Sequence, residues 1–169
     1  SVALAACAGV VVIGVFWCHV VRTLSDGSAL RRVEVLDTVR TWAKKIHEVV
    51  RSTPFPNALQ GRPTGIHPGG QLGGAPAIWL GETGSAQVGG QPEVSGRWAA
   101  TLWWLDQLGA LARYSHDVQV RQTLCGADYG LLDEDTLEPT PEYWASVLWK
   151  RLMGEHVYDV SADPPPPPT

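Results

Sequence analysis

The stretch PAIWLGETGSAQVGG, residues 76–90, joins a short apolar run to a carboxylate and a loop of small residues. Residues 77–80 are apolar, the run stops at Gly81, and Glu82 follows at once. Burying an unpaired carboxylate is costly, so a glutamate in this place needs a reason. The pattern predicts a short buried strand over residues 77–80 with Glu82 at its carboxyl end.

Strand and helix patterns alternate on both sides of this stretch. Residues 10–17 are mostly β-branched and aromatic without polar alternation, which is typical of a strand buried on both faces. Residues 118–121 form a third short strand pattern. Residues 33–51 carry apolar side chains at helical spacing, namely Leu36, Val39, Ala43, Ile46 and Val50.

Two more helices are predicted, one after each of the later strands. Ser95 offers an N-cap for the first, and Thr140 with Pro141 offers an N-cap and first residue for the second. The predicted buried stripes are Trp98, Leu102, Leu105, Leu108 and Ala112, then Trp144, Val147, Leu148 and Leu152. Three strand–helix units in a row predict an α/β fold with a parallel sheet. Such a sheet is either small and open or part of a (β/α)8 barrel, because three units cannot close a barrel.

One domain is predicted over residues 1–160. Residues 52–76 contain five prolines and six glycines and read as a flexible Pro/Gly-rich insertion. Residues 161–169 contain five consecutive prolines before Thr169 and read as a disordered tail. Residues 1–17 are apolar and uncharged, and two interpretations stay open for them. They form either a buried strand with its lead-in or a membrane anchor or signal remnant, although a span needs about 20 residues.

Composition excludes some classes of function. The formal net charge of the 169 residues is −4, and the lysines and arginines are scattered, so no basic face for nucleic acid is expected. The three cysteines are widely spaced, which argues against a disulfide framework. Cys18 and His19 are adjacent, but no further ligands lie at metal-site spacing. We therefore predict neither a metal nor a cofactor.

Candidate site residues follow the predicted strands, where α/β folds collect their ligands. They are His19 after the first strand, Glu82 after the second, Gln122 after the third, Tyr129 in the next loop, and the pair Gly89 and Gly90. Glu82 suits a nucleophile, a general base or a metal ligand, but a structural hydrogen-bond network is an alternative. His19 is a weaker candidate, because a structural histidine is the more ordinary interpretation. The glycine pair allows backbone N–H groups to approach an anion, or simply forms a turn.

Four long motifs carry a family resemblance. WLGETGSAQVGG, WWLDQLGALARY, EVLDTVRTWAKKIHEVV and VRQTLCGADYGLLDEDTLEPTPEYWASVLWKRLMG resemble the heparanases of glycoside hydrolase family 79, and most closely the plant heparanase-like proteins. The match covers roughly residues 10–157 in order, interrupted by residues 52–76. The resemblance implies a partial (β/α)8 barrel, about strands six to eight with their helices, and retaining hydrolysis of β-glucuronides.

The resemblance also assigns roles to residues. Glu82 matches the catalytic nucleophile at the end of the seventh strand. Gly89 and Tyr129, with Gly90 alongside, match the groups that hold the glucuronate carboxylate. His19 and Gln122 match residues close to the nucleophile. The implied substrate is a glucuronide-containing glycan or a small glucuronide, and the implied location is extracellular, in the secretory pathway or at a membrane.

Several positions depart from the family pattern. Cys18 stands in place of a histidine, Val88 in place of a glycine, and Asp128 in place of an asparagine, which puts a negative charge where a glucuronate should bind. The Asn-Glu motif that carries the family's acid/base is missing from this sequence. We therefore expect this chain alone to be nearly inactive. The alternative is a non-catalytic glycan-binding or structural remnant, which could also be anchored to a membrane.

Overall fold

The computed structural model describes residues 2–7, 10–15, 33–53, 77–86 and 89–158. Its elements in chain order are β1 (Val2–Cys7), β2 (Val10–Val15), α1 (Val33–Ser52), β3 (Ala77–Thr83), α2 (Trp98–Arg113), β4 (His116–Arg121) and α3 (Pro141–Leu152). The chain is therefore an α/β protein, as predicted. Most of the expected insertion, from residue 54 on, and the expected polyproline tail lie outside the described residues.

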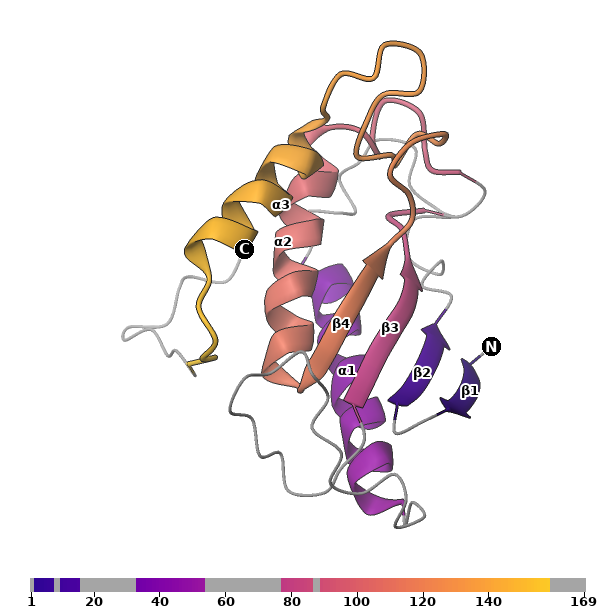
Figure 1. The fold of residues 1–169 in the computed structure, drawn as a ribbon, viewed down its shortest axis with the longest axis vertical. Coiled ribbons are helices and arrows are strands. Elements are labelled where there is room, and N and C mark those ends of the chain that lie inside the picture. The colour runs from indigo at the N-terminus through magenta and orange to yellow at the C-terminus, as the bar shows by residue number, and fades with distance from the viewer. Residues whose placement is uncertain (1, 8–9, 16–32, 54–76, 87–88, 159–169) are drawn as a thin grey trace.

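The four strands form one sheet in the order β1-β2-β3-β4 (Figure 1). β2, β3 and β4 are parallel neighbours, which confirms the three predicted strands and their direction. β1 was not predicted as a separate strand. It pairs antiparallel with β2, with Val2 opposite Val15, so residues 2–7 and 10–15 are both strands. Within the described residues, no helix is long and apolar enough to cross a membrane.

α1 and α2 cover the same face of the sheet at β3. One buried cluster joins α1, β3 and α2 through Val39, Ala43, Val50, Ile78, Leu80, Ala110 and Leu111. The α1 members belong to the predicted stripe, so the helical period of residues 33–51 is confirmed. Both helices of this cluster therefore pack on one face of β3.

The predicted buried faces of the two later helices were wrong. In α2, Trp98 is 68% exposed, whereas Trp103 and Trp104 are buried in a second cluster. The helix is apolar around most of its circumference, so the helical period alone could not choose the face. In α3, Trp144 is 54% exposed and the buried face instead contains Glu142.

The helix starts were predicted with mixed success. Ser95 is not an N-cap, because α2 begins at Trp98 with Arg97 in the N-cap position. Ser95 is instead buried, and its Oγ accepts hydrogen bonds from the Gln91 N–H at 2.8 Å and from the Ser85 hydroxyl at 2.9 Å. Thr140 is the N-cap residue of α3 as predicted, with Pro141 first in the helix.

Candidate functional site

A β-bulge in β3 determines where Glu82 points. Leu80 pairs with Gln119 and Thr83 pairs with Arg121, so β3 has one residue more than β4 between these two pairs. Leu80 packs in the cluster beneath the helices, and Thr83 is hydrogen-bonded to α2, so both side chains face the helices. Neighbouring side chains of a strand point to opposite faces. Glu82 therefore points to the face of the sheet away from α1 and α2.

Without the bulge, strict alternation from Leu80 would turn Glu82 toward the helices. Bulges commonly re-aim a side chain in this way. Gln107 of α2 fixes the arrangement: it is fully buried, and its Nε2 donates to the Thr83 hydroxyl at 2.9 Å. The Glu82 side chain is half-buried, and no residue in the described parts of the chain forms an ion pair with it. Glu82 lies within β3 and not after it, since the strand runs three residues further than predicted.

The loops after β3 and β4 interlock around Tyr129. The Tyr129 backbone N–H donates to the carbonyl oxygen of Gly89 at 3.4 Å. Gly90 has a φ of +117°, and a Cβ there would lie 2.7 Å from the Cβ of Asp128. Only glycine fits this contact, for both conformational and steric reasons. The structure thus brings Gly89, Gly90 and Tyr129 together, and the role that the resemblance assigns to them stays a prediction.

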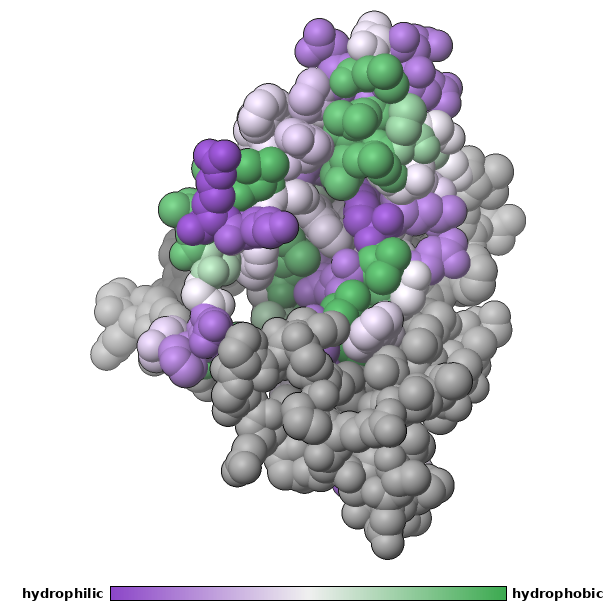
Figure 2. Space-filling model, viewed as in Figure 1, coloured by the Kyte–Doolittle hydropathy of each residue, from purple (hydrophilic) through white to green (hydrophobic). Residues whose placement is uncertain are grey.

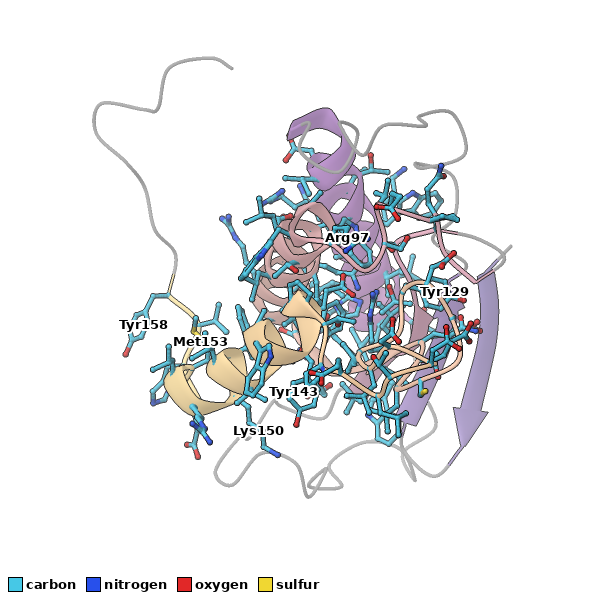
Figure 3. All side chains as sticks on the ribbon, turned by 90° about the horizontal axis from the view of Figure 1, so that it is seen from above. Arg97, Tyr129, Tyr143, Lys150, Met153 and Tyr158 are labelled. Atoms are coloured by element: carbon cyan, nitrogen blue, oxygen red, sulfur yellow. The ribbon has the colours of Figure 1, made fainter. Side chains whose placement is uncertain are left out.

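Tyr129 also lies against the strand that carries Glu82. A Cβ on Gly84 would be 3.2 Å from the Cε1 atom of the Tyr129 ring, so the ring packs directly on Gly84, just beyond the end of β3. Tyr129 is only 5% exposed. Figure 3, which looks onto this end of the molecule, places Tyr129 on the side of the sheet and well away from Lys150 and Met153 of the α3 region.

Gln122 lies beside the same strand end. Its backbone N–H donates to the carbonyl oxygen of Thr83 at 2.9 Å, while its side chain is exposed. Asp128 is also exposed, next to Gly90 and Tyr129. His19 lies outside the described residues, as do Cys18 and Val88. The structure therefore gathers five of the six predicted site residues at one end of β3 and β4, and their roles stay predictions.

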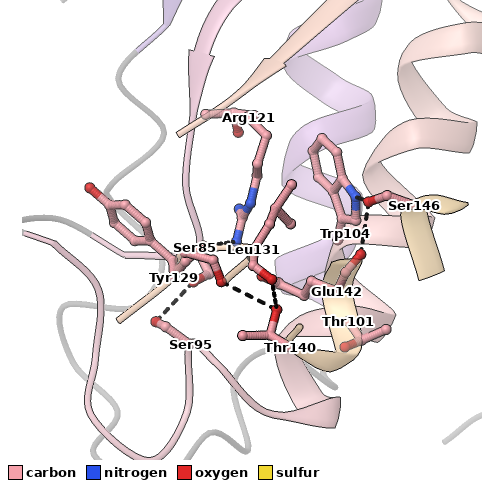
Figure 4. Close-up of polar contacts among 12 residues, drawn as sticks. Ser85, Ser95, Thr101, Trp104, Arg121, Tyr129, Leu131, Thr140, Glu142 and Ser146 are labelled. Carbon is pink, nitrogen blue, oxygen red and sulfur yellow. Dashed lines mark hydrogen bonds and ion pairs between the residues drawn. The ribbon is translucent and has the colours of Figure 1, made fainter. Parts of the chain in front are cut away.

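Sequence reasoning missed a buried ion pair behind the site. Arg121 Nη2 lies 2.5 Å from Glu142 Oε2, and the two side chains are 5% and 0% exposed (Figure 4). Burial raises the pKa of Glu142 to about 7 against the opposing effect of Arg121. Burial also lowers the pKa of Arg121, against the attraction of Glu142. The only sequence signal is an acidic residue in the first turn of α3, and that position is common for exposed glutamates as well.

A pocket of about 290 Å³ lies beside the interlocked loops. Gln91 lines it from the loop after β3, and Asp128 and Thr140 line it from the segment after β4. Figure 2 shows hydrophobic and hydrophilic surface side by side at this end of the molecule. Leu124 and Leu137, both more than half exposed, contribute apolar surface from the segment after β4. Among the described residues, no group of His, Cys, Asp and Glu could hold a metal ion.

Comparison with known proteins places these features in context. The chain is 47% identical over 88 residues to heparanase-like protein 1 of Arabidopsis thaliana, which is 52% of this chain and 16% of that protein. It is 47% identical over 87 residues to the heparanase of Gallus gallus, covering 51% of this chain and 16% of the relative. It is 41% identical over 88 residues to a hyaluronoglucuronidase of Hirudo nipponia, covering 52% and 18%. No protein-family model matches the chain.

Proposed function

We propose that this chain, which is heparanase-like over about half of its length, carries the nucleophile of a retaining glycoside hydrolase. Its match spans about one sixth of the curated relatives, so the activity proposed is that of the protein to which this segment corresponds. The parallel strands β2, β3 and β4 would then be about the sixth to eighth strands of a (β/α)8 barrel. The observation that carries the proposal is the β3 bulge, which turns Glu82 away from the helix-covered face.

In this proposal, a Glu82 carboxylate oxygen attacks the anomeric carbon of a β-glycoside. A glycosyl–enzyme ester bond forms as the glycosidic C–O bond breaks, and the electron pair leaves with the aglycone oxygen. Water then attacks the anomeric carbon and releases a proton to the solvent, and the ester bond breaks to restore the carboxylate. The half-buried, ion-pair-free state of Glu82 within the described residues suits this role, because a nucleophilic carboxylate must stay accessible.

The leaving oxygen needs a proton unless the aglycone is a very good leaving group. A retaining glycosidase supplies it from a second carboxyl group about 5–5.5 Å from the nucleophile. The Asn-Glu motif that would provide this acid is missing from this sequence. We therefore propose that this chain alone reacts only with activated glycosides, such as aryl glycosides with acidic phenols.

The substrate proposed is a β-linked glucuronide, either in a glycan or as a small molecule. Gly89, Gly90 and Tyr129 would receive the sugar carboxylate, since two loops bring them together. Gln122 and His19 would orient Glu82 or the sugar. The net charge of −4 and the scattered basic residues favour a weakly charged glucuronide over a heavily sulfated chain.

A fluorogenic aryl β-glucuronide tests this proposal. We expect slow release of the fluorophore by this chain, faster release by a longer natural product that contains it, and loss of release in Glu82→Gln. Glu93→Gln is a matched control, because Glu93 is an exposed carboxylate in the loop after β3 whose ion pair among the described residues is with Arg97. Unchanged activity in the longer protein carrying Glu82→Gln would refute the nucleophile assignment.

One observation favours a second candidate function. Asp128 lies directly beside Gly90 and Tyr129 and is exposed, so it would repel an incoming sugar carboxylate. This supports a non-catalytic glycan-binding or structural remnant. The same assay separates the two, because a remnant would release no fluorophore even in the longer protein. For location, we propose the secretory pathway, the extracellular space or a membrane surface, and carbonate extraction of membranes tests the last.

A further inference from the structure

Arg121 connects four elements of the protein through one guanidinium group (Figure 4). Its Nη2 contacts Glu142 of α3 and also donates to the backbone carbonyl of Tyr129 at 3.1 Å. Its guanidinium carbon lies 5.3 and 5.2 Å from the ring centroids of Trp103 and Trp104 in α2, and 5.8 Å from that of Tyr129. The last residue of β4 is thus joined to α2, to α3 and to the loop after β4.

The contacts of Arg121 are built into the protein and are not incidental surface pairing. The Arg121 side chain is 5% exposed and that of Glu142 is fully buried. Arg121 Nε and Nη1 have no hydrogen-bond acceptor in the described structure, and the aromatic rings take their place. An isolated surface pair would contribute little, whereas a buried charge must be held by its surroundings.

Arg121 reaches the Gly89–Gly90 turn through a single intervening residue, Tyr129. Tyr129 receives the Arg121 bond on its carbonyl oxygen and donates its own N–H to Gly89. Its ring packs on Gly84 beyond the end of β3. Displacing the Tyr129 backbone would therefore disturb both its hydrogen bond to Gly89 and the packing of its ring on Gly84.

We infer that Arg121 is a positioning residue that holds Tyr129 and the Gly89–Gly90 turn in the geometry for binding an acidic sugar, with Glu142 orienting the guanidinium from α3. The inference rests on the proposed function for its ligand, although the positioning itself rests only on the contacts above. Arg121 does not touch the sugar. It acts through Tyr129, so its loss should affect recognition of the carboxylate more than recognition of a neutral sugar.

Arg121→Lys is the principal variant for testing this inference. A lysine keeps the positive charge for Glu142 but presents one ammonium in place of the planar fork. Both contacts of Arg121 come from Nη2, and the lysine ammonium sits on a side chain one bond shorter, without the planar group that lies beside the Trp103 and Trp104 rings, so it is not held at the Nη2 position. Arg40→Lys is the matched control, because Arg40 also forms an ion pair, with Asp106 between α1 and α2, and its bonds among the described residues go to Asp37 and Asp106.

Two readouts are needed on the full chain. The first is hydrogen exchange of the Tyr129 amide, which the bond to Gly89 protects. The second is the ratio of the dissociation constants for glucose and glucuronic acid, measured by NMR titration. We expect Arg121→Lys to accelerate the exchange at least about tenfold and to reduce the preference for glucuronic acid about tenfold, since a charged hydrogen bond is lost. Arg40→Lys should change neither.

The outcomes separate the positioning role of Arg121 from the proposed substrate. Unchanged exchange in Arg121→Lys overturns the positioning role, and so does faster exchange with an unchanged sugar preference, which would make Arg121 purely structural. If the unaltered chain does not prefer glucuronic acid, the proposed substrate is wrong, and the exchange readout alone decides whether Arg121 fixes Tyr129. Should Arg121→Lys not fold, Glu142→Gln decides: it should accelerate exchange of the Tyr129 amide by a smaller factor, and no acceleration would overturn the inference.

Discussion

Replacing Glu142 by glutamine should change how the stability of the protein depends on pH. The folded carboxyl has a pKa of about 7, because burial outweighs the attraction of Arg121, against 4.5 for the ordinary group. Between these two values the folded protein holds a proton that the unfolded chain has released. The free energy of unfolding therefore falls as pH rises from about 4.5 to about 7, and this contribution is constant above that range.

The size of this effect follows from the two pKa values. At 1.36 kcal/mol per pH unit, the difference between 4.5 and about 7 corresponds to about 3 kcal/mol. His116 has the opposite effect. Its burial lowers the pKa from 6.5 to about 4, so the unfolded chain binds the extra proton, and stability rises with pH between those values by a similar amount.

The effects of these two residues on the free energy of unfolding should nearly cancel in the unaltered protein between pH 4.5 and 6.5. In Glu142→Gln the free energy of unfolding should rise with pH, because only the effect of His116 remains. In His116→Asn it should fall with pH, because only the effect of Glu142 remains. Urea unfolding followed by tryptophan fluorescence at closely spaced pH values measures both slopes. If Glu142→Gln and the unaltered protein show parallel stability curves from pH 4.5 to 7, Glu142 titrates as an exposed group and our account of the buried pair is wrong.

Two further substitutions test the geometry of the site. Gly90→Ala should lower the free energy of unfolding more than Gly89→Ala, because both have positive φ but only Gly90 would bring a Cβ against Asp128. Each should lose about 1–2 kcal/mol from the backbone alone, and equal losses would contradict the close contact at Gly90. Gln107→Leu should cost about 1–3 kcal/mol in urea unfolding by leaving the buried Thr83 hydroxyl without its donor. A fully stable Gln107→Leu protein would show that this bond does not hold the bulge.

Much of the fold could be predicted from the sequence, because local patterns determine it. The β-branched run beginning at residue 10 and the spacing from Leu36 to Val50 each fit one kind of element, and both were confirmed. The buried face of α2 could not be predicted in the same way. Its tryptophans and leucines surround the helix, and the guanidinium of Arg121 comes within 5.3 and 5.2 Å of the Trp103 and Trp104 ring centroids only once the chain has folded.

The residues of the candidate site could be selected from the sequence, but their arrangement could not. Motif resemblance selected Glu82, Gly89, Gly90 and Tyr129, which lie at one end of the sheet, and their roles stay predictions. The bulge that orients Glu82 depends on the pairing of β3 with β4, and no single strand sequence contains that information. The Arg121–Glu142 pair is likewise a long-range contact between residues that are each ordinary in their own segment.

The most direct test of the central claim is covalent trapping of Glu82. A dinitrophenyl 2-deoxy-2-fluoro-β-glucuronide needs no proton donor to lose its aglycone, and the glycosyl–enzyme ester it forms with a retaining nucleophile turns over slowly. We expect mass spectrometry of the digested chain to find the added sugar on Glu82, with none in Glu82→Gln and full labelling in Glu93→Gln. Absence of labelling in the unaltered chain, or equal labelling of Glu82→Gln, would contradict the assignment of Glu82 as the nucleophile.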